Sequence, residues 1–414
     1  MGIGAMVGAG IFALLGEASS IAGSAVYISF IVGGVVALTS AYSLGKLGAA
    51  FPSSGGIIEY LTQSYGIGYF TGSMSIMLYI SAIVSLSLIA KAFANYAVTF
   101  LPANASHLWH PFFSTGIVVL FVMVNLQGAK DVAVWERLIV SLKFIVLSGF
   151  SITGILYLNP ELLTTDKYPP DSNILYSLSV TFFAFEGFRV ITNTAEDMPD
   201  PSRTLPKAMM ASVFFVMLLY VAISFAVFGN LPVDKVIAAK DFALAQAALP
   251  VFGNAGFTAV TITALIATAS AINANLYSAT NVTYKLAKDG ELPEVFGEPI
   301  SHSREGLVIS GILVIVLAVL FDLSEIAAIG AISVLFVHTV THIGHLRIIS
   351  KTGASYILVI FAIVLCLAAM VLALIYVSKQ SNQVVYVLLG FLGIAVSTEV
   401  ILQKINKREV KPRI

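Results

Sequence analysis

The stretch FFAFEGFR, at positions 182–189, decides how this chain folds. It places Glu186, Gly187 and Arg189 inside a run that is otherwise apolar from about 172 to 195. Charged side chains are costly in lipid, and glycine weakens a helix by roughly 1 kcal/mol relative to alanine. We therefore expect an apolar helix that is interrupted at this point.

The composition of the whole chain indicates that its segments lie in lipid. Of 414 residues, 58% are hydrophobic and 11% are charged, and the mean hydropathy is +0.94. A water-soluble globule of this size would need more polar surface. The single cysteine, Cys366, excludes a disulfide framework within the chain. No catalytic motif of a hydrolase, metalloprotease or nucleotide-binding enzyme is found, so we do not expect an enzyme.

Apolar runs long enough to cross the roughly 30 Å hydrocarbon layer recur along the chain. They predict an all-α integral membrane protein with twelve transmembrane helices, in one domain that covers residues 1–414. The predicted spans are 1–22, 24–50, 68–101, 112–128, 133–158, 172–195, 207–229, 251–288, 306–321, 324–344, 354–377 and 383–404. The amphipathic stretch Val233–Leu249 is predicted to form a surface helix. Because the first span begins directly at Met1, we expect upstream residues to be missing.

A second interruption is expected in the first span, where GAGIF occupies positions 8–12. Interruptions at matching places in two halves are typical of inverted-repeat transporters, which bind substrate near the midplane of the bilayer. Open amides of the first span would suit a carboxylate, and free carbonyls of the sixth would suit an ammonium group. The alternative is that the glycines only permit close helix packing. The predicted substrate-binding residues are Val7, Gly8, Ala9, Gly10, Ile11, Phe182, Phe183, Phe185, Glu186 and Gly187.

Four motifs resemble those of the amino acid, polyamine and organocation (APC) transporters. They are GAGIF at 8–12, FEGF at 185–188, AEDMPDPSRTLP at 195–206 and LAKDGELP at 286–293. The resemblance covers nearly the whole chain, and within the family it is closest to the proton-coupled amino acid transporters. It implies the LeuT-type five-plus-five inverted repeat with broken helices 1 and 6, in which 1–158 and 172–344 are the repeats and 354–404 adds two helices. It also implies a cell-membrane permease that transports amino acids by alternating access, with a proton as the coupling ion and no other cofactor.

Lys143 is a candidate for the proton-coupling residue. It lies ten residues into its span, which corresponds to a depth of roughly 15 Å at 1.5 Å per residue. A charged lysine is costly there, so this side chain could bind and release a proton. In proton-coupled members of the family a lysine of the fifth span replaces a sodium ion, and Lys143 matches its surroundings, as Ser270 matches a neighbouring hydroxyl. The alternative is a structural ammonium group bonded to carbonyl groups of the first span.

The role of Glu186 is open at this stage, because family members often have an uncharged residue at the corresponding position. Glu186 could pair with Arg189, contact a substrate ammonium group or bind a second proton. A carboxylate in the site would favour cationic amino acids or polyamines. Phe183 and Phe188 could form a hydrophobic gate, although ordinary packing between helices would explain a phenylalanine at either position equally well.

The basic residues in the predicted loops indicate the orientation, since cytoplasmic loops are enriched in Lys and Arg. One side collects most of them, among others Lys46, Arg203, Lys207, Lys285, Lys288, Arg347 and Lys351, whereas the other has only Lys167, Lys235, Lys240 and Lys379. Both termini of this multi-pass protein are therefore expected on the cytoplasmic side.

Two further polar features are less specific. His338, His342 and His345 share one face of a helix near its cytoplasmic end, a spacing that a metal site would allow. Without a carboxylate or cysteine nearby in the sequence, we expect histidines in interfacial water and no metal. Lys91 is expected to reach outer water from a long third span.

Other functions remain open at the level of the sequence. Within the transporter class these are an amino acid or polyamine exchanger and a sodium-coupled symporter, although the Lys143 ammonium group argues against sodium. A sensor or subunit built on the same fold would not transport. The expected partners are a small amino acid substrate and the lipid bilayer, with no nucleic acid, and the oligomeric state is left open.

Overall fold

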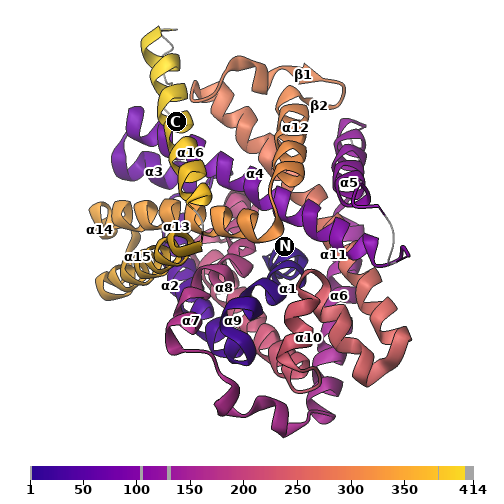
Figure 1. The fold of residues 1–414 in the computed structure, drawn as a ribbon. Coiled ribbons are helices and arrows are strands. Elements are labelled where there is room, and N and C mark those ends of the chain that lie inside the picture. Colours follow the sequence, from indigo (N-terminus) through magenta and orange to yellow (C-terminus); the bar gives the residue numbers. More distant parts are fainter. Residues whose placement is uncertain (1, 103–105, 128–131, 381, 406–414) are drawn as a thin grey trace.

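The computed structural model describes residues 2–102, 106–127, 132–380 and 382–405, and these are almost entirely helical (Figure 1). The long helices are α1 (Gly2–Ala22), α2 (Val26–Ala50), α4 (Tyr69–Val98), α5 (Trp109–Leu126), α6 (Val132–Leu156), α9 (Pro201–Phe228), α11 (Ala243–Asp289), α12 (Glu305–Leu320), α13 (Leu323–Arg347), α15 (Tyr356–Gln380) and α16 (Gln383–Val400). The sixth span comprises α7 (Asp171–Tyr176), α8 (Leu178–Ala184) and the 3-10 helix η4 (Glu186–Asp197). A helix therefore lies at each place where a span is predicted.

Short elements connect the long helices. They are η1 (Gly23–Ala25), α3 (Ile57–Tyr65), η2 (Pro160–Leu163), η3 (Thr165–Lys167), α10 (Val233–Ala238), η5 (Lys240–Phe242), η6 (Glu294–Gly297), α14 (Ile349–Thr352) and the π-helix η7 (Ile401–Ile405). A two-stranded antiparallel sheet pairs β1 (Pro299–Ile300) with β2 (Ser303–Arg304).

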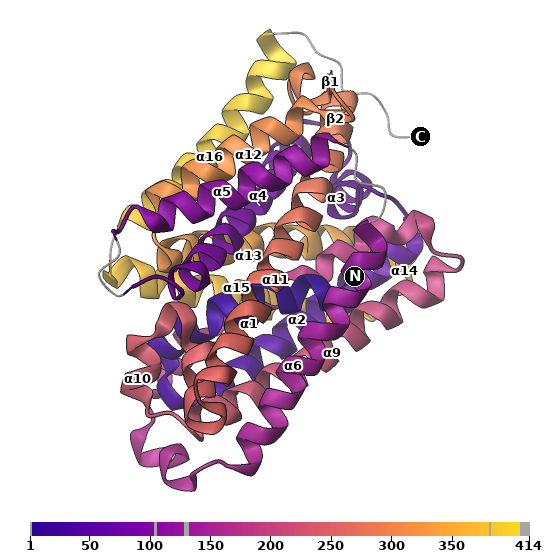
Figure 2. The same ribbon diagram turned by 90° about the vertical axis from the view of Figure 1, so that its right-hand side faces the viewer.

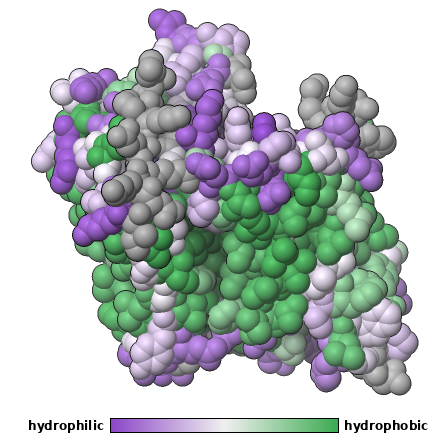
Figure 3. Space-filling model, turned by 90° about the horizontal axis from the view of Figure 1, so that it is seen from above, coloured by the Kyte–Doolittle hydropathy of each residue, from purple (hydrophilic) through white to green (hydrophobic). Residues whose placement is uncertain are grey.

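Ten segments of the described chain are long and apolar enough to cross a membrane. One of them, Gly10–Ala50, contains parts of two predicted spans, and α12 is shorter than the other candidates at 16 residues. Figure 3 shows a broad hydrophobic area on the molecular surface, with hydrophilic residues gathered along two opposite edges. This distribution is typical of a protein surrounded by lipid. The count of twelve crossings and the inverted repeat stay predictions.

The interruption expected in the first span is wrong. The helix α1 runs from Gly2 to Ala22 without a break, through all of the GAGIF motif. Its glycines serve close packing instead: a β-carbon at Gly8 would lie 2.7 Å from the β-carbon of Ala271 on α11. A continuous helix also satisfies its backbone groups internally, which matters where no water is present.

The interruption expected in the sixth span is present. The α-helical part ends at Ala184, and the 3-10 helix η4 begins at Glu186. The tighter winding of η4 changes which side chains face α1 after this point. The FFAFEGFR stretch thus forms a junction between two kinds of helix.

The stretch Val233–Leu249 does not form one surface helix. Only α10, Val233–Ala238, is a separate helix, and the later residues belong to η5 and to the first turns of α11. Within α11, Gly253 has φ 62° and ψ −160°, values that interrupt the helix. Glycine adopts this conformation without the steric cost that a side chain would bring.

The helix α1 lies in the interior of the bundle in both ribbon views (Figures 1 and 2). It contacts α4, α6, α8, α9, η4 and α11. Most of its residues are buried, among them Phe12 and Leu14. Because α1 touches both parts of the sixth span, the junction between α8 and η4 lies near the centre of the molecule.

Candidate functional site

The backbones of α1 and the sixth span approach each other at two glycines. A β-carbon at Gly187 would lie 2.6 Å from the carbonyl carbon of Ala5. A β-carbon at Gly10 would overlap the carbonyl group of Ala184. At either position the added β-carbon would lie closer to these backbone atoms than real β-carbons do, so only glycine fits there.

Tyr220 of α9 joins the two segments from the side. Its hydroxyl lies 2.7 Å from the Met6 carbonyl oxygen of α1 and 3.3 Å from the Ala184 carbonyl oxygen of α8. Its ring packs against Phe185 and Phe30, with centroids 5.1 and 5.4 Å away. Tyr220 therefore stabilises the junction with a hydroxyl that replaces water as a donor to these carbonyl groups.

A cavity, here called the central cavity, lies at this junction. It is lined by Ala5, Met6, Gly10 and Leu14 of α1, Ser85, Leu88 and Ile89 of α4, Phe183 and Ala184 of α8, Glu186, Gly187, Arg189 and Val190 of η4, and Asn275 of α11. Its lining is mostly apolar, with a few polar groups from three different helices. This combination is typical of small-molecule sites in proteins.

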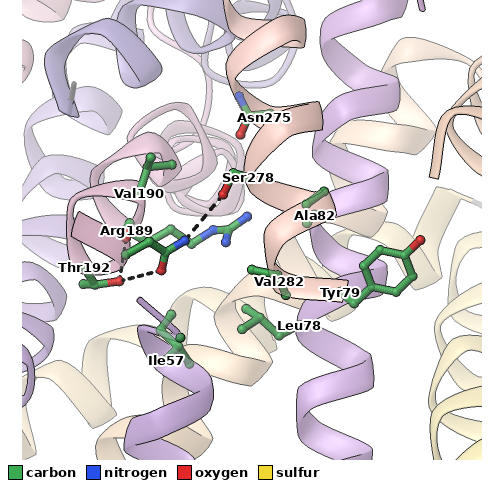
Figure 4. Close-up of a pocket in the computed structure, with 13 residues that line it drawn as sticks. Ile57, Leu78, Tyr79, Ala82, Arg189, Val190, Thr192, Asn275, Ser278 and Val282 are labelled. Carbon is green, nitrogen blue, oxygen red and sulfur yellow. Dashed lines mark hydrogen bonds between the residues drawn. The ribbon is translucent and has the colours of Figure 1, made fainter. Parts of the chain in front are cut away.

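A second cavity adjoins the central one and shares Arg189, Val190 and Asn275 with it. Its other lining residues are Gly55, Ile57, Leu78, Tyr79, Ala82, Thr192, Asn193, Ser278, Ala279 and Val282. Figure 4 shows these side chains, with Arg189 extending from η4 toward α11. The second cavity lies near the loop before α3, where Lys285 donates a hydrogen bond to Ser53 Oγ at 3.2 Å.

Glu186 and Arg189 form an ion pair, one of the arrangements that the sequence allows for them. The two side chains are 8% and 13% exposed, so water screens their attraction little. Both residues line the central cavity, and Arg189 also lines the second one. The ion pair therefore lies where the two cavities meet.

Lys143 of α6 is buried, with 2% of its surface exposed, and its ammonium group donates a hydrogen bond to the Gly4 carbonyl oxygen at 2.6 Å. Ser270 lies half-buried on α11, which packs against both α1 and α6. Gly4 is in the same turn of α1 as Ala5 and Met6, which line the central cavity. The structure thus places this amine directly behind the wall of the cavity.

The predicted substrate-binding residues divide into two groups. Gly10, Phe183, Glu186 and Gly187 line the central cavity. The others do not line it: Val7, Ile11, Phe182 and Phe185 are fully buried in the core, Gly8 faces α11, and the side chain of Ala9 lies outside the described residues. Of the two predicted gate residues, Phe183 lines the cavity, whereas Phe188 is buried with its ring 5.8 Å from that of His338.

Sequence reasoning missed several residues of this region. Tyr220 and Asn275 gave a weak signal, as polar side chains within apolar spans. Glu17, at the other end of α1, was missed as well. It accepts hydrogen bonds from Ser324 at 2.8 and 2.9 Å and pairs with Lys240 at 3.4 Å. This cluster, here called the outer contact, joins α1, η5 and α13.

The expectation that the three histidines lie in interfacial water is wrong. His338, His342 and His345 are fully buried. Ser40 of α2 binds the first two, and Ser43 of α2 binds the third. The carboxylate that the sequence lacked nearby is Glu186, which folding brings close to His338. Among the described residues, 2–405 with their gaps, no group of three or more metal-ligating side chains occurs.

Lys91 also differs from its expected position in water. It is half-buried, and its ammonium group donates to the carbonyl oxygens of Ala318 and Phe321, at 3.1 and 3.0 Å. These groups end α12, where a cation is favoured by the helix dipole. Lys91 is therefore a cap of α12 and does not itself line the central cavity.

Comparison with known proteins agrees with this geometry. Residues 1–396 match the model of the family described as amino acid permease. An uncharacterized protein of Methanocaldococcus jannaschii is 35% identical over 99% of this chain and 94% of its own length. The inner membrane transport protein YbaT of Escherichia coli is 30% identical over 98% and 94%, and the serine/threonine exchanger SteT of Bacillus subtilis is 24% identical over 72% and 68%.

The family and these named relatives are transporters rather than enzymes. With its many apolar helices, the present chain is a multi-pass membrane protein. It belongs to the amino acid permease family of the APC superfamily.

Proposed function

We propose that this chain carries amino acids across the cell membrane by alternating access, in symport with a proton. The observation that supports this most directly is the buried Lys143 ammonium group, bonded to Gly4 O directly behind the central cavity. A proton on this amine strengthens its bond to α1, and the loss of that proton weakens it. Protonation of Lys143 would in this way be linked to the position of α1 and to the shape of the cavity.

The arrangement of the cavities supports alternating access. The second cavity continues from the central cavity toward the loop between α2 and α3, on the side that is rich in basic residues. At the other end of α1, the outer contact joins Glu17, Lys240 and Ser324. We propose that this is a state closed to the outside, with both termini and the second cavity on the cytoplasmic side.

The central cavity supports a small neutral amino acid as the substrate. The carboxylate that lines this cavity, Glu186 of η4, is already paired with Arg189, so it offers no free charge to a cationic side chain of a substrate. Ser85 and Asn275 remain as uncharged polar groups in the wall. The relative named as a serine/threonine exchanger supports the same class of substrate, and it makes exchange the second candidate for the transport mode.

Uptake by proteoliposomes tests the proposal. An imposed inward proton gradient should drive accumulation of neutral amino acids without sodium, and Lys143→Ala should reduce this accumulation to the level of protein-free vesicles. Lys91→Met is the matched control, because it also removes a lysine bonded to carbonyl oxygens within a span. This variant should be less stable but still respond to the proton gradient.

Gradient-driven accumulation by Lys143→Ala at the wild-type level would refute the coupling role. Accumulation that depends on sodium alone would replace the proton by sodium in the proposal. Uptake only into vesicles that were preloaded with amino acid would identify an exchanger.

A further inference from the structure

We propose that His342, Ser40 and His338 form a proton-transfer path that ends at Glu186, and that Glu186 is a second proton-binding site. The path, here called the histidine path, runs from His342 of α13 through Ser40 of α2 to the edge of the central cavity. Its use in transport rests on the proposed proton coupling, but its existence does not.

The distances along the histidine path are short. Ser40 Oγ lies 2.9 Å from His338 Nδ1 and 2.9 Å from His342 Nε2, so a single hydroxyl joins the two rings. His338 Nε2 lies 3.7 Å from Glu186 Oε2, a gap that must shorten when a proton passes. Glu186 in turn lines the central cavity. Four side chains from α13, α2 and η4 therefore form one line.

Burial makes packing a poor explanation for these residues. His338, His342 and Ser40 are all 0% exposed. Moreover, His338 Nε2 and His342 Nδ1 have no hydrogen-bond partner among the residues that the structure describes. Buried polar atoms without partners are costly, and an apolar side chain could fill either place without that cost. A proton path needs such atoms, because each ring must accept a proton on one nitrogen and release it from the other.

The charged and titratable groups around the histidine path allow it to take up one proton. From η4, Arg189 is paired with Glu186, and from α15 the buried Cys366 is close enough to interact electrostatically with that carboxylate. From α8 and η4, the rings of Phe182 and Phe188 lie 5.8 Å from that of His338. Two further titratable groups of the described residues lie along α13. His345 on α13 itself binds Ser43 and Thr352, and Tyr65 of α3 donates to the Val340 carbonyl oxygen.

The proton transfer balances along these atoms. A proton binds to His342 Nδ1, and the ring releases the proton of Nε2 to Ser40 Oγ. Ser40 passes its own hydroxyl proton to His338 Nδ1, and His338 releases the proton of Nε2 to Glu186 Oε2. One proton is gained by the carboxylate, and each ring ends as the opposite neutral tautomer, from which rotation or a proton in the reverse direction restores it.

Protonation of Glu186 has a direct consequence for the cavities. A neutral carboxyl group attracts the Arg189 guanidinium group, which lines both cavities, far less strongly than a carboxylate does. Arg189 is then free to move, and the boundary between the cavities changes. The histidine path would thus bring a proton to the ion pair that separates the two cavities.

Infrared difference spectroscopy after a rapid drop in pH tests the path on the full chain in lipid. The band of the protonated carboxyl group of Glu186 is identified by its loss in Glu186→Gln. In Ser40→Ala and in His342→Gln this band should rise more slowly than in the wild type, by about tenfold or more, since each variant interrupts the transfer. Ser43→Ala is the matched control, because Ser43 lies one turn along α2 and binds only His345 of the three histidines.

An unchanged rise in both Ser40→Ala and His342→Gln would overturn the path and indicate that water in the central cavity protonates Glu186 directly. An equal slowing in Ser43→Ala would also overturn it, because a general disturbance of α2 would then be the cause. The spectrum does not depend on uptake. A wild-type protein without proton-driven uptake but with the expected spectra would contradict the proposed function and leave the path supported.

Discussion

At Gly187 there is no room for a β-carbon between η4 and the backbone of Ala5 and Met6. We predict that Gly187→Ala forces the sixth span away from α1 and abolishes uptake. Overpacking of this kind costs about 1–3 kcal/mol, and the thermal unfolding midpoint in detergent should fall accordingly.

The control for this prediction is Gly390→Ala in α16, where nothing lies within 4 Å of the added carbon. Its stability should stay within about 1 kcal/mol of the wild type. If Gly187→Ala were as stable and as active as Gly390→Ala, the close contact between η4 and α1 would not be required for function.

At the scale of single residues, the sequence could indicate part of the site. Lys143, Glu186 and Arg189 are charged residues in apolar runs, and all three lie at the cavity or directly behind it. The environment of His338 was not predictable, because its partner Ser40 is 298 positions away in the sequence. Long-range pairs of this kind depend on how α2 and α13 pack, which periodicity within one helix does not reveal.

At the scale of helices, positions were predicted well, whereas helix continuity was predicted correctly for the sixth span and wrongly for the first. Hydropathy located every long helix, because lipid demands about 20 apolar residues for each crossing. The glycines of α1 were read as a break, yet each costs only roughly 1 kcal/mol in a helix. Contacts such as that of Gly8 with Ala271 offset this cost through close packing. The junction at Glu186 was predicted correctly, because there charge and glycine coincide.

The outer contact gives a prediction at this scale, since it joins α1, η5 and α13. Glu17→Gln removes the negative charge that attracts Lys240 but keeps the size of the side chain. Lys240 is 40% exposed, so we expect this ion pair to stabilise the closed state by only about 1 kcal/mol. Its loss should shift the equilibrium roughly fivefold toward a state open to the outside.

The shift is measurable with a cysteine at position 85 in the wall of the central cavity. Ser85→Cys, in a Cys366→Ser background, should react faster with a membrane-impermeant maleimide from outside when Glu17→Gln is added. The control is Glu161→Gln, which makes the same charge change in η2. Equal rates with and without Glu17→Gln would show that the outer contact does not close this side.

At the scale of the whole molecule, a multi-pass helical bundle contains the central cavity and the second cavity that adjoins it. Charged side chains that lie within apolar spans gather around the junction of α1, α8 and η4, near the centre of the bundle. Lys143 lies behind that junction, and Glu186 lies in it. A carrier that couples a substrate to a proton requires this proximity, because both must affect the same moving helix.

The most direct measurement records amino acid and proton entry together in sodium-free proteoliposomes that enclose a pH-sensitive dye. The account predicts that addition of a neutral amino acid acidifies the interior in a fixed ratio to the amino acid taken up. Amino acid uptake with no accompanying acidification would contradict it.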